Sequence, residues 1–130
     1  MSVPTLALIA HDACKDELVS FALRRRDDLG RFGLLATGTT GWRLADALER
    51  PVERVRSGPT GGDIQIGARV LEGGVAGLIF LRDPLTAHPH EPDIQALLKL
   101  CDLHNVPLAT NLATADLMLD GLLLRHPVRY

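Results

Sequence analysis

The sequence alternates five short β-like runs with segments in which apolar residues recur at helical spacing. The first run, residues 6–10 (LALIA), contains no polar residue, which is typical of a strand buried on both faces of a parallel sheet. The other runs lie at 32–36, 52–55, 77–81 and 107–110. Helices are expected over 15–29, 42–49, 64–72, 93–105 and 113–119, and the spacing assigns no element to 121–130. This alternation predicts an α/β fold, a three-layer doubly wound sandwich around a mostly parallel five-stranded sheet.

Length and composition favour one domain that binds no nucleic acid. A chain of 130 residues is large enough for a single buried core, so we expect one domain over residues 1–130. Hydrophobic residues make up 46%, which argues against disorder. A net charge of −2 and an aromatic content of 4% supply neither the basic field nor the stacking residues that nucleic-acid binding uses.

The sequence also lacks signals for export, membrane insertion and cysteine-based sites. Its N-terminus has neither the charged region nor the long apolar core of a signal peptide, and no apolar stretch reaches membrane-spanning length. Cys14 and Cys101 are far apart and form no CxxC pair, so neither a zinc site nor a disulfide framework is indicated. We therefore expect a soluble cytoplasmic protein with no membrane partner.

Polar residues follow every expected strand. In chain order they are His11 and Asp12, Thr37 to Thr40, Ser57 to Asp63, Asp83, and Asn111. The carboxyl ends of the strands in an open α/β sheet lie at one edge, where ligands bind. This edge is the candidate site.

The loop at residues 57–67 (SGPTGGDIQIG) can turn sharply and approach a ligand closely because of its glycines and proline. Asp63 stands where the next helix is expected to open, so the helix dipole should favour its ionised form. One interpretation is a tight strand-to-helix turn capped by Asp63. The other is a loop that wraps an oxyanion and holds a fixed carboxylate beside it.

Phosphate is the ligand that the neighbouring segments favour. Residues 38–41 (GTTG) offer hydroxyls and backbone N–H groups at a helix start, and Lys15 supplies a cation one helical turn beyond His11. The segment is not a Walker A loop, and no GxGxxG indicates a dinucleotide. A small phosphorylated molecule beside Asp63 and one or both loop histidines is therefore expected.

Residues 88–93 (HPHEPD) allow three interpretations. Two histidines near a carboxylate resemble part of a metallohydrolase site, but the HxHxDH spacing is absent and no metal is expected. A solvent-exposed turn is the second interpretation. In the third, His90 is a proton donor oriented by Asp93.

Several blocks together resemble methylglyoxal synthase. They are residues 8–15 (LIAHDACK), 36–41 (ATGTTG), 57–67, 83–85 (DPL) and 89–93 (PHEPD). The resemblance implies an enzyme of the methylglyoxal synthase-like fold that converts dihydroxyacetone phosphate to methylglyoxal and inorganic phosphate, a bypass of glycolysis, without a metal or organic cofactor. It implies Asp63 as the base and His90 at the substrate carbonyl. If Asp63 were only a helix cap, Asp12 or Asp93 would be the candidate for the base. The substrate-binding positions that it implies are His11, Lys15, Thr37, Gly38, Thr39, Thr40, Ser57, Gly58 and His90.

The resemblance further implies a homohexamer regulated allosterically by phosphate. In the family a C-terminal arginine can reach a neighbouring subunit, and the candidates for that role in this chain are Arg125 and Arg129. The alternative function is a non-catalytic regulatory module of the same fold that binds a phosphorylated effector. Such a module would not need both Asp63 and His90.

Overall fold

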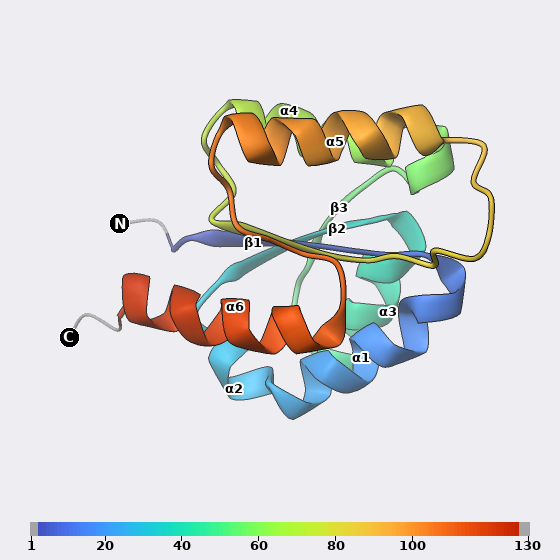
Figure 1. The fold of residues 1–130 in the computed structure, drawn as a ribbon. Coiled ribbons are helices and arrows are strands. Elements are labelled where there is room, and N and C mark those ends of the chain that lie inside the picture. The colour runs from blue at the N-terminus through green and yellow to red at the C-terminus, as the bar shows by residue number, and fades with distance from the viewer. Residues whose placement is uncertain (1–2, 128–130) are drawn as a thin grey trace.

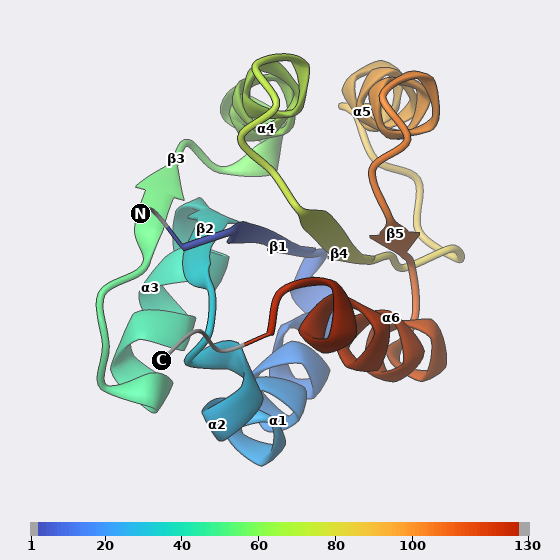
Figure 2. The same cartoon turned by 90° about the vertical axis from the view of Figure 1, so that its left-hand side faces the viewer.

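Five parallel strands form a single sheet in the order β3-β2-β1-β4-β5 in the computed structural model, which describes residues 3–127 (Figure 2). The strand bounds are β1 Thr5–Ala10, β2 Gly33–Thr37, β3 Glu53–Val55, β4 Gly77–Leu81 and β5 Leu108–Ala109. β1 lies at the centre, where Leu8 pairs with Ala36 of β2 on one side and with Ile79 of β4 on the other. The α/β fold and the five-stranded parallel sheet are confirmed.

Helices cover both faces of this sheet (Figure 1). On one face lie α4 (Gly62–Leu71) and α5 (Glu91–Leu103). On the other lie α1 (Lys15–Arg24), α2 (Arg26–Leu29), α3 (Gly38–Leu48) and α6 (Leu112–Arg125). Two short 3₁₀ helices, η1 (Asp12–Cys14) and η2 (Gly58–Thr60), follow β1 and β3. The three layers match the expected doubly wound sandwich, and no helix among residues 3–127 has the length and apolar character needed to cross a bilayer.

The uninterrupted apolar run of β1 follows from its position between the two helical layers. Leu6, Leu8 and Ala10 point into the core beneath the sheet, whereas Ala7 and Ile9 point into the core under α4 and α5. Successive side chains of a strand alternate between faces, so a strand covered on both sides has no polar position. Burying each large aliphatic side chain contributes about 1.5–3 kcal/mol.

The helix expected over 15–29 is divided into α1 and α2 at Arg25, and α4 and α5 each begin two residues earlier than expected. The bounds of α3 and α6 differ more, and both differences have a local cause. α3 begins at Gly38, four residues before the expected start at 42, so Thr39 and Thr40 lie in its first turn rather than in a loop. α6 continues to Arg125, beyond the expected end at 119, because Leu122 packs into the core. Apolar residues occupy nearly every side of this helix, which hides the helical period in the sequence.

Glycine at position 62 is required by the packing of α4 against the chain that enters it. A Cβ atom at Gly62 would lie 1.9 Å from the Arg56 carbonyl oxygen. We expect Gly62→Ala to lower the free energy of unfolding by about 3 kcal/mol or more, because backbone would have to move. Denaturant unfolding provides the measurement.

The matched control is Gly121→Ala in α6, where an added Cβ meets no atom within 4 Å. Alanine there should stabilise the protein by about 0.5–1 kcal/mol, since glycine is a poor helix former. Equal stabilities for the two variants would contradict the close approach seen at Gly62.

Candidate active site

A cavity of about 520 Å³ opens at the carboxyl edge of the sheet. It lies beside the end of β1, between β2 and β4. After β1 the chain adds β2 and β3 on one side of this strand, and then β4 and β5 on the other side. Open α/β sheets bind ligands at this switch point. The described ends of the chain lie at the opposite edge (Figure 1).

The cavity gathers most of the expected site residues. Those that line it are His11, Asp12, Lys15, Thr37, Thr39, Thr40, Ser57, Gly58, Asp63 and His90. Gly38 and Asp93 do not. Gly38 instead allows a close contact, since a Cβ atom there would lie 2.9 Å from the Ser57 Cα. Asp93 touches the site through its backbone, whose N–H donates to the His90 carbonyl at 3.0 Å.

One end of the cavity suits an anion. The first turn of α3 contains Thr39 and Thr40, and first-turn N–H groups have no acceptor within their own helix. The Lys15 ammonium lies at the same end, where it donates to the Ala10 carbonyl at 3.2 Å and pairs with the Asp12 carboxylate at 2.5 Å. Hydroxyls, amides and a cation thus surround this part of the cavity, a combination that binds phosphate.

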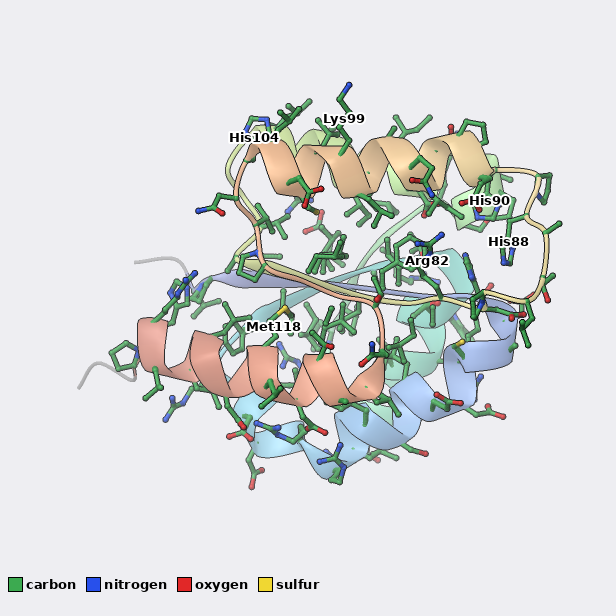
Figure 3. All side chains as sticks on the ribbon, in the orientation of Figure 1. Arg82, His88, His90, Lys99, His104 and Met118 are labelled. Carbon is green, nitrogen blue, oxygen red and sulfur yellow. The ribbon has the colours of Figure 1, made fainter. Side chains whose placement is uncertain are left out.

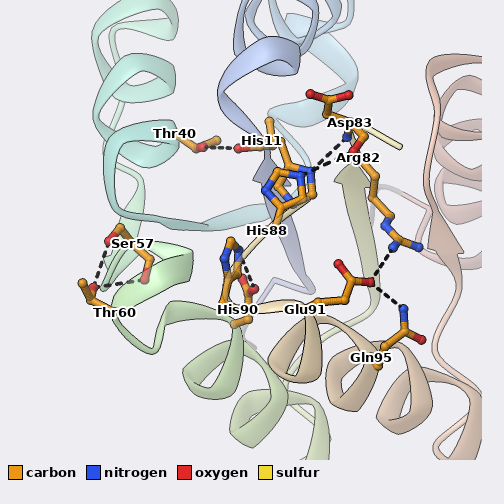
Figure 4. A network of polar contacts seen from close by, with 12 residues as sticks. His11, Thr40, Ser57, Thr60, Arg82, Asp83, His88, His90, Glu91 and Gln95 are labelled. Carbon is orange, nitrogen blue, oxygen red and sulfur yellow. Dashed lines mark hydrogen bonds and ion pairs between the residues drawn. The ribbon is translucent and has the colours of Figure 1, made fainter. Parts of the chain in front are cut away.

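The glycine loop is folded back on itself at the cavity wall. The N–H of Gly62 donates to the Ser57 carbonyl at 2.8 Å, and the Ser57 and Thr60 hydroxyls lie 2.8 Å apart (Figure 4). Gly61 has a φ of 106°, a conformation that favours glycine. These contacts turn the chain tightly into α4 and place Gly58 beside Asp63.

Asp63 does not cap α4, so that interpretation of its role is wrong. The N-cap residue is Gly61, with no side-chain capping hydrogen bond, and Asp63 lies inside the first turn. Its side chain is 1% exposed, and neither carboxylate oxygen has a hydrogen-bond partner among the described residues. A buried carboxyl group without partners is costly in a folded protein, which suits a functional rather than a structural group.

His90 lies directly beside this carboxyl group. The His90 Nε2 is 3.6 Å from the Asp63 Oδ2, and His90 Nδ1 is buried without a hydrogen-bond partner in residues 3–127. A Cβ atom at Gly58 would lie 3.2 Å from both the Asp63 Oδ1 and the His90 Nε2. Glycine therefore keeps the space in front of the pair open.

Burial sets the protonation behaviour of Asp63. It raises the pKa of this carboxyl group, and the charge of Asp93 adds to the rise, while His90 opposes it. The sequence alone suggests that the dipole of α4 favours the ionised form. The removal of water from the buried carboxyl group raises its pKa by more than the helix dipole lowers it, because the group is almost fully enclosed. A carboxylate with a raised pKa is a stronger base when ionised.

The structure adds residues that the sequence did not assign to a phosphate or carbonyl site. Asp83, Thr86 and His88 line the cavity together with the expected set. The sequence placed Asp83 among the polar strand ends and left open whether one or both loop histidines lie beside the ligand; it also allowed His88 as a metal ligand or as part of an exposed turn. Among residues 3–127, no group of three or more His, Cys, Asp or Glu side chains is placed to hold a metal ion. His88 and His90 are two residues apart in the chain, and this spacing was the available signal that both rings face the same cavity.

Arg125, one of the two candidates for a C-terminal arginine, does not line this cavity. Arg125 ends α6, which runs from the end of β5 back towards the opposite edge of the sheet (Figure 1). Arg129 is beyond the described residues.

Comparisons with known proteins point to one family. A family model described as an MGS-like domain matches residues 17–110. A methylglyoxal synthase of Thermus thermophilus is 63% identical over 114 residues, which cover 88% of this chain and 90% of that protein. The methylglyoxal synthase of Cupriavidus pinatubonensis is 60% identical over 122 residues, or 94% of each chain. The crystal structure of methylglyoxal synthase from Elizabethkingia anophelis superposes with a TM-score of 0.85 at 39% identity, covering 95% of this chain and 84% of that one.

The raised pKa of Asp63 predicts a stability difference that depends on pH. Ionising this group in the folded protein is unfavourable, so its contribution opposes folding above the raised pKa and vanishes below the unfolded value of 3.8. Asp63→Asn should therefore be more stable than the wild type at pH 7, and the two should converge as the pH falls below about 4. Thermal unfolding across this pH range measures the difference.

Asp116→Asn is the control with the opposite sign. Hydrogen bonds from Arg24 and Arg25 lower the pKa of Asp116, so this carboxylate contributes stability above its unfolded pKa. The substitution should destabilise the protein at pH 7 and have no effect at low pH. If Asp63→Asn behaved in the same way, Asp63 would be a stabilising group after all.

Proposed function

This chain belongs to the methylglyoxal synthase family of enzymes, and we propose that it converts dihydroxyacetone phosphate to methylglyoxal and inorganic phosphate in the cytoplasm. Asp63 is the base in this reaction, and His90 acts at the substrate carbonyl. The observation that carries the proposal is a buried carboxyl group without hydrogen-bond partners among the described residues, 3.6 Å from His90 in a cavity whose other end suits phosphate.

The reaction begins with a proton on the carbon that carries the free hydroxyl, next to the ketone. Asp63 accepts this proton, and the electron pair left on carbon forms an enediolate. A carboxylate enclosed by protein and held by α4 loses little orientation and no hydrogen bond when it takes a proton. These properties support Asp63 as the base.

His90 suits the role of donor to the developing oxyanion. Its Nε2 and the Asp63 Oδ2 are close enough to reach adjacent atoms of one small substrate. A donor fixed in a water-poor cavity stabilises an enediolate more strongly than water does. The His90 side chain is only 9% exposed, so the surrounding residues keep its Nε2 in place.

Phosphate leaves in the second step. The bond between carbon and the bridging phosphate oxygen breaks, the enol of methylglyoxal forms, and a proton returned to carbon gives methylglyoxal. Lys15, Thr39 and Thr40, with the N-terminus of α3, would stabilise the charge on the departing phosphate. Ser57, which contacts the start of α3 at Gly38, lines this end of the cavity, and Gly58 lies between it and the Asp63–His90 pair.

The alternative candidates for the base are less suited to the task. Asp12 is exposed, and the hydrogen bond and charge of Lys15 lower its pKa, which weakens it as a base. Asp93 does not line the cavity. A regulatory site that only binds a phosphorylated effector would gain nothing from Asp63, because an unpaired carboxylate repels an anion. The site therefore favours catalysis over the non-catalytic module.

We extend the proposal to a homohexamer that phosphate regulates. Several leucines are largely exposed, including Leu117 and Leu124 of α6 at 74% and 84% and Leu85 at 94%. Contacts between subunits would remove such apolar side chains from water. Inorganic phosphate, as a product, would occupy the anion-binding end of the cavity.

Assembly and regulation give one testable prediction. The mass in solution, measured by light scattering, should be six times that of the chain. Inorganic phosphate should inhibit turnover and make the substrate curves sigmoidal, because linked sites respond together. A monomer would contradict the assembly, and hyperbolic curves at every phosphate concentration would contradict coupling between sites.

The role of Asp63 gives the decisive prediction for the reaction. Asp63→Asn should lower kcat for methylglyoxal formation by ~10²–10⁴-fold or more, because it removes the base and keeps the side-chain size. Binding of a non-reacting phosphate analogue should stay the same or tighten, since a charge that repels anions is lost. Methylglyoxal and free phosphate are assayed with dihydroxyacetone phosphate as substrate.

Asp93→Asn and Asp12→Asn serve as matched controls. Each removes one carboxylate near the site without touching the proposed base, and each should cost much less in kcat than Asp63→Asn. A nearly active Asp63→Asn enzyme alongside an inactive Asp93→Asn or Asp12→Asn enzyme would move the base to that residue.

A further inference from the structure

Two histidine rings stack on each other beside the proposed base. The ring centroids of His11, at the end of β1, and His88, in the loop before α5, are 3.7 Å apart, and the ring planes meet at 27°. Phe80 of β4 contacts the His11 ring edge-on, with the centroids 5.2 Å apart. His11, which lines the cavity, thus has aromatic contacts from two residues, and its stacking on His88 can be seen in Figure 4. The proposed reaction assigns no role to His88.

The backbone of Asp83 determines which ring nitrogens carry protons. Its N–H donates to the His11 Nδ1 at 2.9 Å, so that nitrogen is an unprotonated acceptor. The proton of the uncharged His11 ring must then be on Nε2. The carbonyl oxygen of Asp83 lies 3.4 Å from the His88 Nε2, and because a carbonyl only accepts, His88 donates from that nitrogen.

The His11 Nε2 is a donor that lacks an acceptor in the described part of the chain. The side chain is 7% exposed and lines the cavity, and its Nε2 is buried with no hydrogen-bond partner among residues 3–127. Leaving a buried donor unpaired is unfavourable. An oxygen atom of a bound ligand would satisfy it.

The surroundings of His11 keep its ring uncharged near neutral pH. The pKa of His11 is lowered to about 4, first by burial and then by the charges of His88, His90 and Arg82, while Asp83 opposes them. The stacked ring of His88 contributes to this state by covering His11 and by placing a second basic group against it. An uncharged imidazole donates a hydrogen bond without readily giving up its proton.

We infer that His88 is a positioning residue, which stacks on His11 and holds that ring as an uncharged Nε2–H donor to an oxygen of the bound ligand. The inference rests on the proposed function for the identity of that ligand. An uncharged donor stabilises an enediolate oxygen without protonating it, so the intermediate survives until phosphate leaves. His90, whose ring centroid is 6.0 Å from that of His11, would then contact the same intermediate.

The test follows the protonation of His11 directly. NMR titration of protein with ¹⁵N-labelled histidine should show His11 with an unprotonated Nδ1 and a protonated Nε2 in the wild type down to about pH 4. In His88→Ala the ring is uncovered, and the titration of His11 should move up by about one pH unit or more. His88→Phe keeps a flat ring on His11 and should shift it much less. His104→Ala, at the far end of α5, is the control and should leave His11 unchanged (Figure 3).

Turnover of dihydroxyacetone phosphate gives the second measurement. His88→Ala should lower kcat about tenfold with a smaller change in KM, because a misplaced donor costs more in the transition state than in binding. His88→Phe should retain most of the activity. If His88→Ala is too unstable to study, His88→Gln removes the ring while keeping a polar side chain suited to the half-exposed loop.

An unchanged His11 titration in His88→Ala would overturn the inference. A shifted His11 titration in a His88→Ala enzyme that keeps its full kcat would overturn it as well. Failure of the wild type to form methylglyoxal would overturn the proposed function instead. The NMR comparison would still decide whether His88 controls His11, since it does not depend on turnover.

Discussion

The pairing of β1 with β2 on one side and β4 on the other is the constraint on which the rest of the molecule depends. Parallel strands that meet in register bring their carboxyl ends to one edge, and β1 contributes His11 there while β4 contributes Asp83. The β1–β4 pairing extends past the strand end, where the His11 N–H donates to the Leu81 carbonyl at 3.1 Å. The cavity opens at this junction because the crossover connections leave the sheet in opposite directions on either side of it.

This rigid edge allows the site to contain groups that would be unfavourable elsewhere. The Asp63 carboxyl group, the His11 Nε2 and the His90 Nδ1 are all buried without partners among residues 3–127. Each such group lowers stability, and the surrounding core must offset the loss. Two apolar cores, one on each face of the sheet, provide that stabilisation and hold the unpaired groups at fixed distances.

The chemistry of the cavity is divided between its two ends. One end, built from the start of α3, the glycine loop and Lys15, provides donors and positive charge for a phosphate group. The other, built from Asp63 and the histidine loop, provides a buried carboxyl group and imidazole nitrogens. Glycines at the boundary keep side chains out of the space that a substrate would occupy, as the short distances from a Cβ atom at Gly58 indicate.

Much of this protein could be read from its sequence. Alternating apolar runs identified the strands, because a strand covered on both faces must be apolar at every position, as β1 is. The same reasoning brought the polar strand ends together, and ten of the residues expected at the site line the cavity.

The features that the sequence did not reveal depend on interactions between segments far apart in the chain. Asp63 looked like a helix cap, since the local sequence does not reveal that Gly61 occupies the cap position and that burial outweighs the helix dipole. The length of α6 depended on the packing of Leu122 against the sheet. His88 gained a role only when β1 and β4 placed its ring on His11. Sequence periodicity reports which face of an element is buried, whereas the pKa and orientation of a side chain depend on neighbours that only the folded chain supplies.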